Sequence, residues 1–135
     1  MSSDQVAKVL RHAPYFPVFD VERSLSFYVE VLGFRCEYSA GSPAQFAICS
    51  RDDFAVMLRR VAEAEVIVPV EKQGGTWDAF FWVSDADALC SELKAKGADI
   101  VYDPLIQESY RMREFAIRDC DGHVLGFGHS LDHDD

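Results

Sequence analysis

The residues of this chain that could act as nucleophiles are its four cysteines, Cys36, Cys49, Cys90 and Cys120. A catalytic thiol needs a neighbour that lowers its pKa, and none of the four has a histidine at an evident pairing distance in the sequence. They also form no Cys-x-x-Cys pair. We therefore expect reduced structural thiols rather than nucleophilic catalysis.

A second segment of interest is DCDGHVLGFGHS, residues 119–130. Its Asp-x-Asp-Gly start predicts a tight turn, and Val124, Leu125 and Phe127 predict a strand after it. Gly126 stands in the middle of this strand, where a glycine packs against nothing and weakens the sheet. The position therefore requires an explanation from the elements around it.

Those elements repeat along the chain. FPVFDVERSLSFYVEVLGF (16–34) and FFWVSDADALCSELKAKGA (80–98) each predict a strand, a helix capped by Asp20 or Asp85, and a glycine stop at Gly33 or Gly97. FAICSRDDFAVMLRR (46–60) and FAIRDCDGHVLGFGH (115–129) also match each other. Because the two pairs follow in the same order, the chain is predicted to be two copies of one unit.

The composition is typical of a soluble globular protein, with 135 residues and 49% hydrophobic side chains. A net charge of −10 repels phosphate backbones, so we expect no nucleic-acid partner, and it would favour a cationic guest. The N-terminal sequence has no basic region followed by an apolar run. We therefore expect no membrane partner and a cytoplasmic location.

The whole chain resembles the vicinal oxygen chelate superfamily of glyoxalases, bleomycin resistance proteins and extradiol dioxygenases. The resemblance lies in VFDVERSLSFYVEVLGF, FWVSDADALCSELKAKGA and REFAIRDCDGHVLGF. It implies an α+β fold with two paired βαβββ modules, a curved mixed sheet around a cup-shaped cavity, and helices on the convex side. We expect a single domain over 1–135, with module 1 at about 12–60, a connection at 61–75 and module 2 at about 76–129.

The resemblance also implies where a metal would bind. Superfamily enzymes carry His and Glu ligands seven residues before each capping Asp and four residues after the glycine of the turn. These positions hold Ala13, Met57, Asp78 and Gly126. Only Asp78 has an oxygen ligand, which is too few for a divalent ion. We therefore expect no metal, no cofactor and no catalytic residue, and Gly126 marks the place of the missing glutamate.

Side-chain alternation predicts what lines the cup. If Asp78 points inward, Phe80 and Trp82 do so as well. Its carboxylate either stays solvated or has a partner, for which Arg59, Arg111 and a ligand amine are the candidates. The structural alternative is that these aromatic residues only fill a core or a dimer interface. The predicted ligand-binding residues are Tyr15, Met57, Arg59, Asp78, Phe80, Trp82 and Arg111.

The favoured hypothesis is a noncatalytic homodimer of the bleomycin-resistance type. It would sequester a small molecule, such as a cationic, bleomycin-like antibiotic or an aromatic compound, and the N-terminal segment could be exchanged between subunits. The alternatives are a metal-dependent lyase, isomerase or dioxygenase with an atypical ligand set drawn from His12, Asp78 and His123, and a metal-free catalyst with Asp78 as base. A scaffold with an occluded cup is the third class.

Overall fold

The computed structural model describes residues 5–132 and contains two modules that repeat the same order of elements. Module 1 contains β1 (Tyr15–Val18), α1 (Val21–Glu30), β2 (Arg35–Ala40), β3 (Phe46–Arg51) and β4 (Phe54–Arg60). Module 2 contains β5 (Ala79–Trp82), α2 (Ala86–Ala95), β6 (Asp99–Gln107), β7 (Met112–Arg118) and β8 (Val124–Ser130). The 3-10 turns η1 (Ala64–Val66) and η2 (Val70–Gln73) lie between them. The predicted βαβββ repeat is confirmed.

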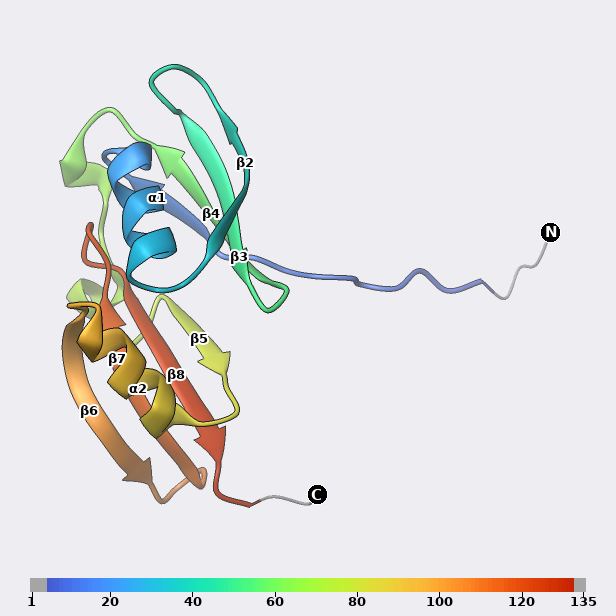
Figure 1. Ribbon diagram of the computed structural model, residues 1–135, viewed down its shortest axis with the longest axis vertical. Coiled ribbons are helices and arrows are strands. Elements are labelled where there is room, and N and C mark those ends of the chain that lie inside the picture. The colour runs from blue at the N-terminus through green and yellow to red at the C-terminus, as the bar shows by residue number, and fades with distance from the viewer. Residues whose placement is uncertain (1–4, 133–135) are drawn as a thin grey trace.

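Each module forms its own four-stranded mixed sheet. The strand order is β1-β4-β3-β2 in sheet 1 and β5-β8-β7-β6 in sheet 2. The first strand of each module lies parallel to the last, and the other neighbours are antiparallel. Figure 1 shows the two modules stacked along the long axis, each with its helix over one face of its sheet. The predicted α+β class is therefore confirmed.

The two helices begin at the predicted aspartates. The Asp20 carboxylate accepts a hydrogen bond from Arg23 N (3.1 Å), and the Asp85 carboxylate accepts one from Ala88 N (3.0 Å). Such caps satisfy amide groups that the first helical turn leaves without a partner. No described helix is long and apolar enough to cross a membrane.

The strands alternate between a covered face and a face that points away from the helix, which we call the open face. In β1, Phe16 and Val18 are buried in the core under the helices, whereas Tyr15 is 56% exposed. In β5, Phe81 packs against the core and Trp82 is 69% exposed. The predicted orientations of these strands are therefore correct, and aromatic side chains lie on the open faces.

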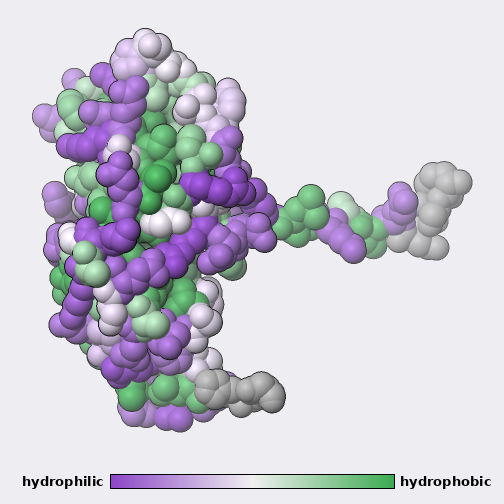
Figure 2. Space-filling view, in the orientation of Figure 1, coloured by the Kyte–Doolittle hydropathy of each residue, from purple (hydrophilic) through white to green (hydrophobic). Residues whose placement is uncertain are grey.

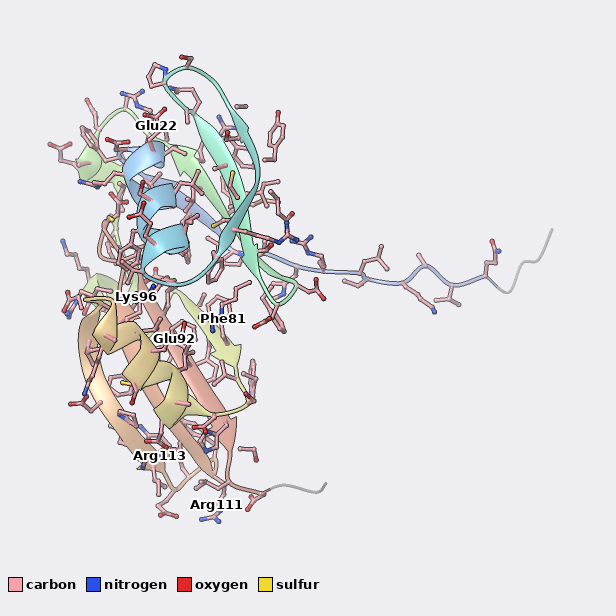
Figure 3. All side chains as sticks on the ribbon, in the orientation of Figure 1. Glu22, Phe81, Glu92, Lys96, Arg111 and Arg113 are labelled. Carbon is pink, nitrogen blue, oxygen red and sulfur yellow. The ribbon has the colours of Figure 1, made fainter. Side chains whose placement is uncertain are left out.

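Side chains from both modules hold the two units together. Asp121, in the β7–β8 turn, accepts hydrogen bonds from Phe19 N and Ser24 Oγ (both 3.2 Å), and Tyr28 Oη donates to Asp119 (2.8 Å). These contacts anchor the β7–β8 turn of module 2 against the β1–α1 segment of module 1. Figure 3 shows Glu92 and Phe81 near this junction.

The segment before β1 extends away from the body of the molecule (Figure 1). Its three large aliphatic residues, Val6, Val9 and Leu10, are 85–90% exposed. Figure 2 shows hydrophobic residues along this arm. One ion pair, between Arg11 and Glu37 (3.1 Å), connects its base to β2.

Candidate functional site

The open face of sheet 2 carries a hollow with aromatic walls. Its volume is about 430 Å³, and its lining residues are Trp77, Phe80, Trp82, Tyr110 and Met112. The ring centroids of Trp77 and Phe80 lie 4.7 Å apart, and those of Phe80 and Trp82 lie 5.1 Å apart, both edge to face. A largely exposed Trp82 beside such a hollow is an apolar surface available to a partner or a ligand.

Two glycines of β8 lie directly against the rings that line this hollow. A Cβ atom at Gly126 would lie 2.6 Å from atoms of the Trp77 ring and 2.7 Å from the Phe80 ring. A Cβ atom at Gly128 would lie 2.9 Å from Phe80. The glycines therefore allow the rings to rest directly on the backbone, which is a physical reason for a glycine inside this strand.

A buried carboxylate lies on the same face. Glu114 in β7 is 1% exposed, and its two oxygens accept hydrogen bonds from the phenols of Tyr102 and Tyr110, each at 2.6 Å. Trp77 Nε1 donates to the Tyr102 oxygen at 2.9 Å. These four residues connect the aromatic hollow to a second hollow of about 330 Å³, whose lining includes Glu114, Trp77 and Tyr110.

Burial and the carboxylate keep both phenols protonated. Burial raises the pKa of Tyr110 to about 12, and the hydrogen bond to Glu114 raises it in the same direction. The pKa of Tyr102 is raised further above its ordinary value, again chiefly by burial. Both phenols are therefore neutral hydrogen-bond donors at neutral pH.

The open face of sheet 1 brings together three of the predicted ligand-binding residues. Tyr15 and Met57 are partners in the parallel β1–β4 pair, and Arg59 Nε donates to the Tyr15 hydroxyl at 2.9 Å. The Arg59 guanidinium also lies over the Phe46 ring, 5.3 Å from its centroid. This face therefore combines aromatic surface with one cation.

Asp78 occupies a different position from the one expected. Its oxygens accept hydrogen bonds from Val70 N (3.0 Å) and Val124 N (2.8 Å), and its side chain is largely buried. The carboxylate thus fastens the connecting segment to the start of β8. It meets neither Arg59 nor Arg111, and both oxygens already have amide partners.

Arg111 lies at the outer end of module 2, in the β6–β7 turn (Figure 3). Its guanidinium forms ion pairs with Glu108 and Asp132, both at 3.3 Å. Arg111, one of the candidate partners of Asp78, therefore pairs with other carboxylates instead. Its backbone has φ +56°, a conformation that favours glycine.

The residues at the superfamily's metal positions do not fit a divalent ion. Ala13 and Gly126 offer no ligand atom, Met57 offers a thioether, and Asp78 is bound to backbone amides. The structure does bring His123 Nδ1 within 3.7 Å of Asp78, but His12 lies on the exposed arm. Within residues 5–132, no three His, Cys, Asp or Glu side chains are grouped to hold a metal.

A further hollow, of about 400 Å³, lies between the modules. It is lined by the β3–β4 hairpin and by the β5–α2 segment, and the Arg51–Glu92 ion pair (2.8 Å) crosses its rim. Its apolar lining includes Phe81 and Phe127, which face the core of module 2. We do not assign the ligand site to it, because its charged side chains already have partners within the protein: Arg51 pairs with Glu92 and Asp52, and Asp85 caps α2.

The cysteines have the character of structural thiols. All four are free, and Cys49 and Cys90 are buried. Burial raises the pKa of Cys49 to about 12 and also raises the pKa values of Cys90 and Cys120. A nucleophilic thiolate requires the opposite shift.

Sequence reasoning missed the polar part of the sheet 2 face. Trp77, Tyr102, Tyr110 and Glu114 were not among the predicted ligand-binding residues. The available signal was Glu114 itself, because alternation places it on the same strand face as Met112 and Ala116, where a carboxylate is unusual.

Residues 9–127 match the family model described as the Glyoxalase/Bleomycin resistance protein/Dioxygenase superfamily. The chain belongs to this superfamily. None of the curated protein sequences compared with the chain matches it.

Several solved structures share the fold. TioX from Micromonospora sp. ML1 is 27% identical, with a TM-score of 0.72 over 91% of this chain and 100% of that one. The bleomycin-binding protein of Streptomyces verticillus, complexed with copper(II)-bleomycin, is 25% identical, with a TM-score of 0.66 over 95% and 100%. A glyoxalase-related enzyme from Clostridium phytofermentans, 18% identical, has a TM-score of 0.73 over 96% and 100% and shows the fold alone.

Proposed function

We propose that this protein binds and sequesters a small aromatic molecule without a metal and without changing it chemically. The observation that carries the proposal is the aromatic hollow on the open face of sheet 2. Its volume of about 430 Å³ lies within the usual range of small-molecule sites, which are mostly apolar with a few polar groups. The residues at the superfamily's metal positions, Ala13, Met57, Asp78 and Gly126, offer too few ligand atoms for a divalent ion. This supports binding rather than metal catalysis.

The candidate guest is a cationic antibiotic of the bleomycin kind. A net charge of −10 favours a cation. The similar Streptomyces verticillus protein is complexed with copper(II)-bleomycin in its structure. The proposed ligand-binding residues are Trp77, Phe80, Trp82, Tyr110 and Met112 on sheet 2, with Tyr15, Met57 and Arg59 on sheet 1. We leave out Asp78 and Arg111, because their polar groups already have partners.

The working unit in this proposal is a homodimer. The arm presents Val6, Val9 and Leu10 almost fully to solvent, and Tyr15 and Trp82 are exposed on the open faces. Aliphatic and aromatic surface of this extent is stabilised when a partner covers it. A second copy of the chain would cover the arm and bring a sheet 1 face opposite a sheet 2 face, with the guest between them.

Intrinsic fluorescence tests the binding proposal, because both tryptophans of the chain, Trp77 and Trp82, line the hollow. Metal-free bleomycin and a panel of planar aromatic compounds would be titrated with and without EDTA. We expect saturable quenching and a raised Tm with at least one compound, unchanged by the chelator. The variant Trp82→Phe should weaken the binding.

Two results would contradict the proposal. If neither fluorescence nor Tm responds to any compound, the occluded scaffold is favoured. If the purified protein contains a stoichiometric metal whose removal abolishes binding, the metal-dependent enzyme is favoured.

A further inference from the structure

Glu114 is a buried carboxylate without a cation beside it. It is 1% exposed, and no salt bridge involving it occurs within residues 5–132. The nearby arginines of β7 are engaged elsewhere, since Arg113 pairs with Asp87 (2.7 Å) and Arg118 pairs with Glu71 (2.8 Å). An ionised carboxylate in such surroundings is costly unless hydrogen bonds or an opposite charge stabilise it.

The hydrogen bonds around Glu114 run in one direction. An indole N–H can only donate, so Trp77 gives its proton to the Tyr102 oxygen, and the Tyr102 hydroxyl then donates to Glu114. Tyr110 donates to the other oxygen. The two phenols leave further lone pairs on the carboxylate for another donor.

The Glu114 carboxylate adjoins the aromatic hollow. Trp77 and Tyr110 line both hollows, whereas Glu114 lines only the smaller one. A flat ring lying against Trp77, Phe80 and Trp82 would therefore have one edge directed past Tyr110 toward the carboxylate. Aromatic faces attract cations as well, so both parts of the site favour the same kind of guest.

On the basis of the proposed function, we propose that Glu114 is the specificity-determining residue of this site and selects ligands with a protonated amine or amidinium at the edge of a planar aromatic body. The ring occupies the hollow of Trp77, Phe80 and Trp82, and the cation occupies the hollow lined by Glu114. A neutral ligand of the same shape leaves the carboxylate without an opposite charge and binds more weakly.

Two probes of nearly the same shape test this inference on the full chain by calorimetry. 9-Aminoacridine is a cation at neutral pH, and acridine is neutral there. We expect the wild-type protein to bind 9-aminoacridine about tenfold more tightly than acridine, consistent with a desolvated charge contact. In Glu114→Gln this preference should disappear, because the affinity for 9-aminoacridine falls while that for acridine stays within about twofold.

Matched variants separate the local charge from other effects. Glu30→Gln removes the same charge from the exposed end of α1 and should leave the preference intact. Tyr110→Phe removes one phenol but keeps the carboxylate, so the cationic probe should remain preferred. Near-ultraviolet circular dichroism checks that each variant is folded. The ratio of the affinities for 9-aminoacridine and acridine is measured on the wild-type protein and so does not depend on the folding of any variant.

The outcomes distinguish this inference from the proposed function. Equal binding of both probes by the wild-type protein, or a preference that survives in Glu114→Gln, overturns the role of Glu114 and leaves an aromatic binding site. Absence of binding by both probes overturns the role of Glu114 and also counts against the aromatic site itself.

Discussion

Gly126 illustrates how a single missing side chain shapes the candidate site. The resemblance to the superfamily implies that this residue stands where a metal ligand would be, and in the structure Trp77 and Phe80 lie directly against it. The two statements are compatible. A position without a side chain removes a ligand and at the same time admits two aromatic rings.

Gly126→Ala should therefore disturb both stability and binding. The added methyl group would lie 2.6 Å from Trp77, so the rings must move outward. Overpacking of this kind costs about 1–3 kcal/mol in free energy of unfolding. Urea denaturation measures the stability, a fluorescence titration measures the binding, and the tryptophan emission maximum reports the displacement of Trp77.

Ala116→Gly is a useful comparison for this variant, because Ala116 is the cross-strand partner of Gly126 on β7. This variant removes one methyl group and does not displace the rings of Trp77 and Phe80. Unchanged tryptophan emission in Gly126→Ala would contradict the proposed contact.

At the level of elements, the regular features were predictable from the sequence and the irregular ones were not. Asp20 and Asp85 predicted both helix starts, and alternation predicted which faces of β1 and β5 are covered. The partners of Glu114 depend on shifts in the β6–β7 pairing on either side of Tyr102. Such bulges follow no simple residue pattern, so the hydrogen-bonded group could not be assembled in advance.

The same limit applies to Asp78. Its position before β5 was predictable, but its partner Val70 belongs to a 3-10 turn in the connecting segment. Alternation along a strand gives no information about a backbone amide contributed by a loop. The carboxylate was therefore expected to be available to a ligand.

The β6–β7 turn offers a test at this level. Arg111 adopts φ +56°, which costs a residue with a Cβ about 1 kcal/mol relative to glycine. Arg111→Gly should therefore raise the free energy of unfolding by about 0.5–1 kcal/mol, because the exposed ion pairs that it loses contribute little. Chemical denaturation measures the change.

Arg111→Ala is the matched control, since it removes the ion pairs with Glu108 and Asp132 but keeps the Cβ. It should not stabilise the protein. Equal stability of the glycine and alanine variants would show that the backbone conformation of the turn is not the cause.

For the whole molecule, the Arg51–Glu92 ion pair joins the two modules and makes part of the stability dependent on pH. The hydrogen bond and charge of Arg51 hold the pKa of Glu92 below its ordinary value of 4.5. A lowered carboxyl pKa stabilises the folded state above the unfolded value, and the contribution is lost as pH falls through the folded value.

Glu92→Gln should therefore be less stable than the wild type at neutral pH and equally stable well below pH 4.5. The difference should stay below about 1 kcal/mol, because Glu92 is 43% exposed and solvent screens the pair. Urea denaturation at both pH values measures it, with Glu30→Gln as a control for the loss of one exposed carboxylate from a helix. A difference in the free energy of unfolding that persists in acid would indicate lost packing instead.

The arm provides a test of the proposed dimer. Val9→Asp places a charge on a side chain that is now 90% exposed, so it should not harm a free arm. If a second copy covers the arm, the variant should dissociate at concentrations where the wild type is dimeric. Sedimentation velocity distinguishes the two cases, and Lys8→Asp, at the neighbouring exposed position, is the control. A wild-type protein that sediments as a monomer would contradict the dimer.

The pairing of the first strand of each module with the last also orders events during translation. Sheet 1 needs nothing beyond Arg60, so module 1 can close while the ribosome is still making module 2. In contrast, β5 bonds only to β8, and β8 ends at Ser130. The segment with both tryptophans must therefore stay without its partner strand until β8 has been translated, and a stop codon before Leu125 would leave it permanently unpaired.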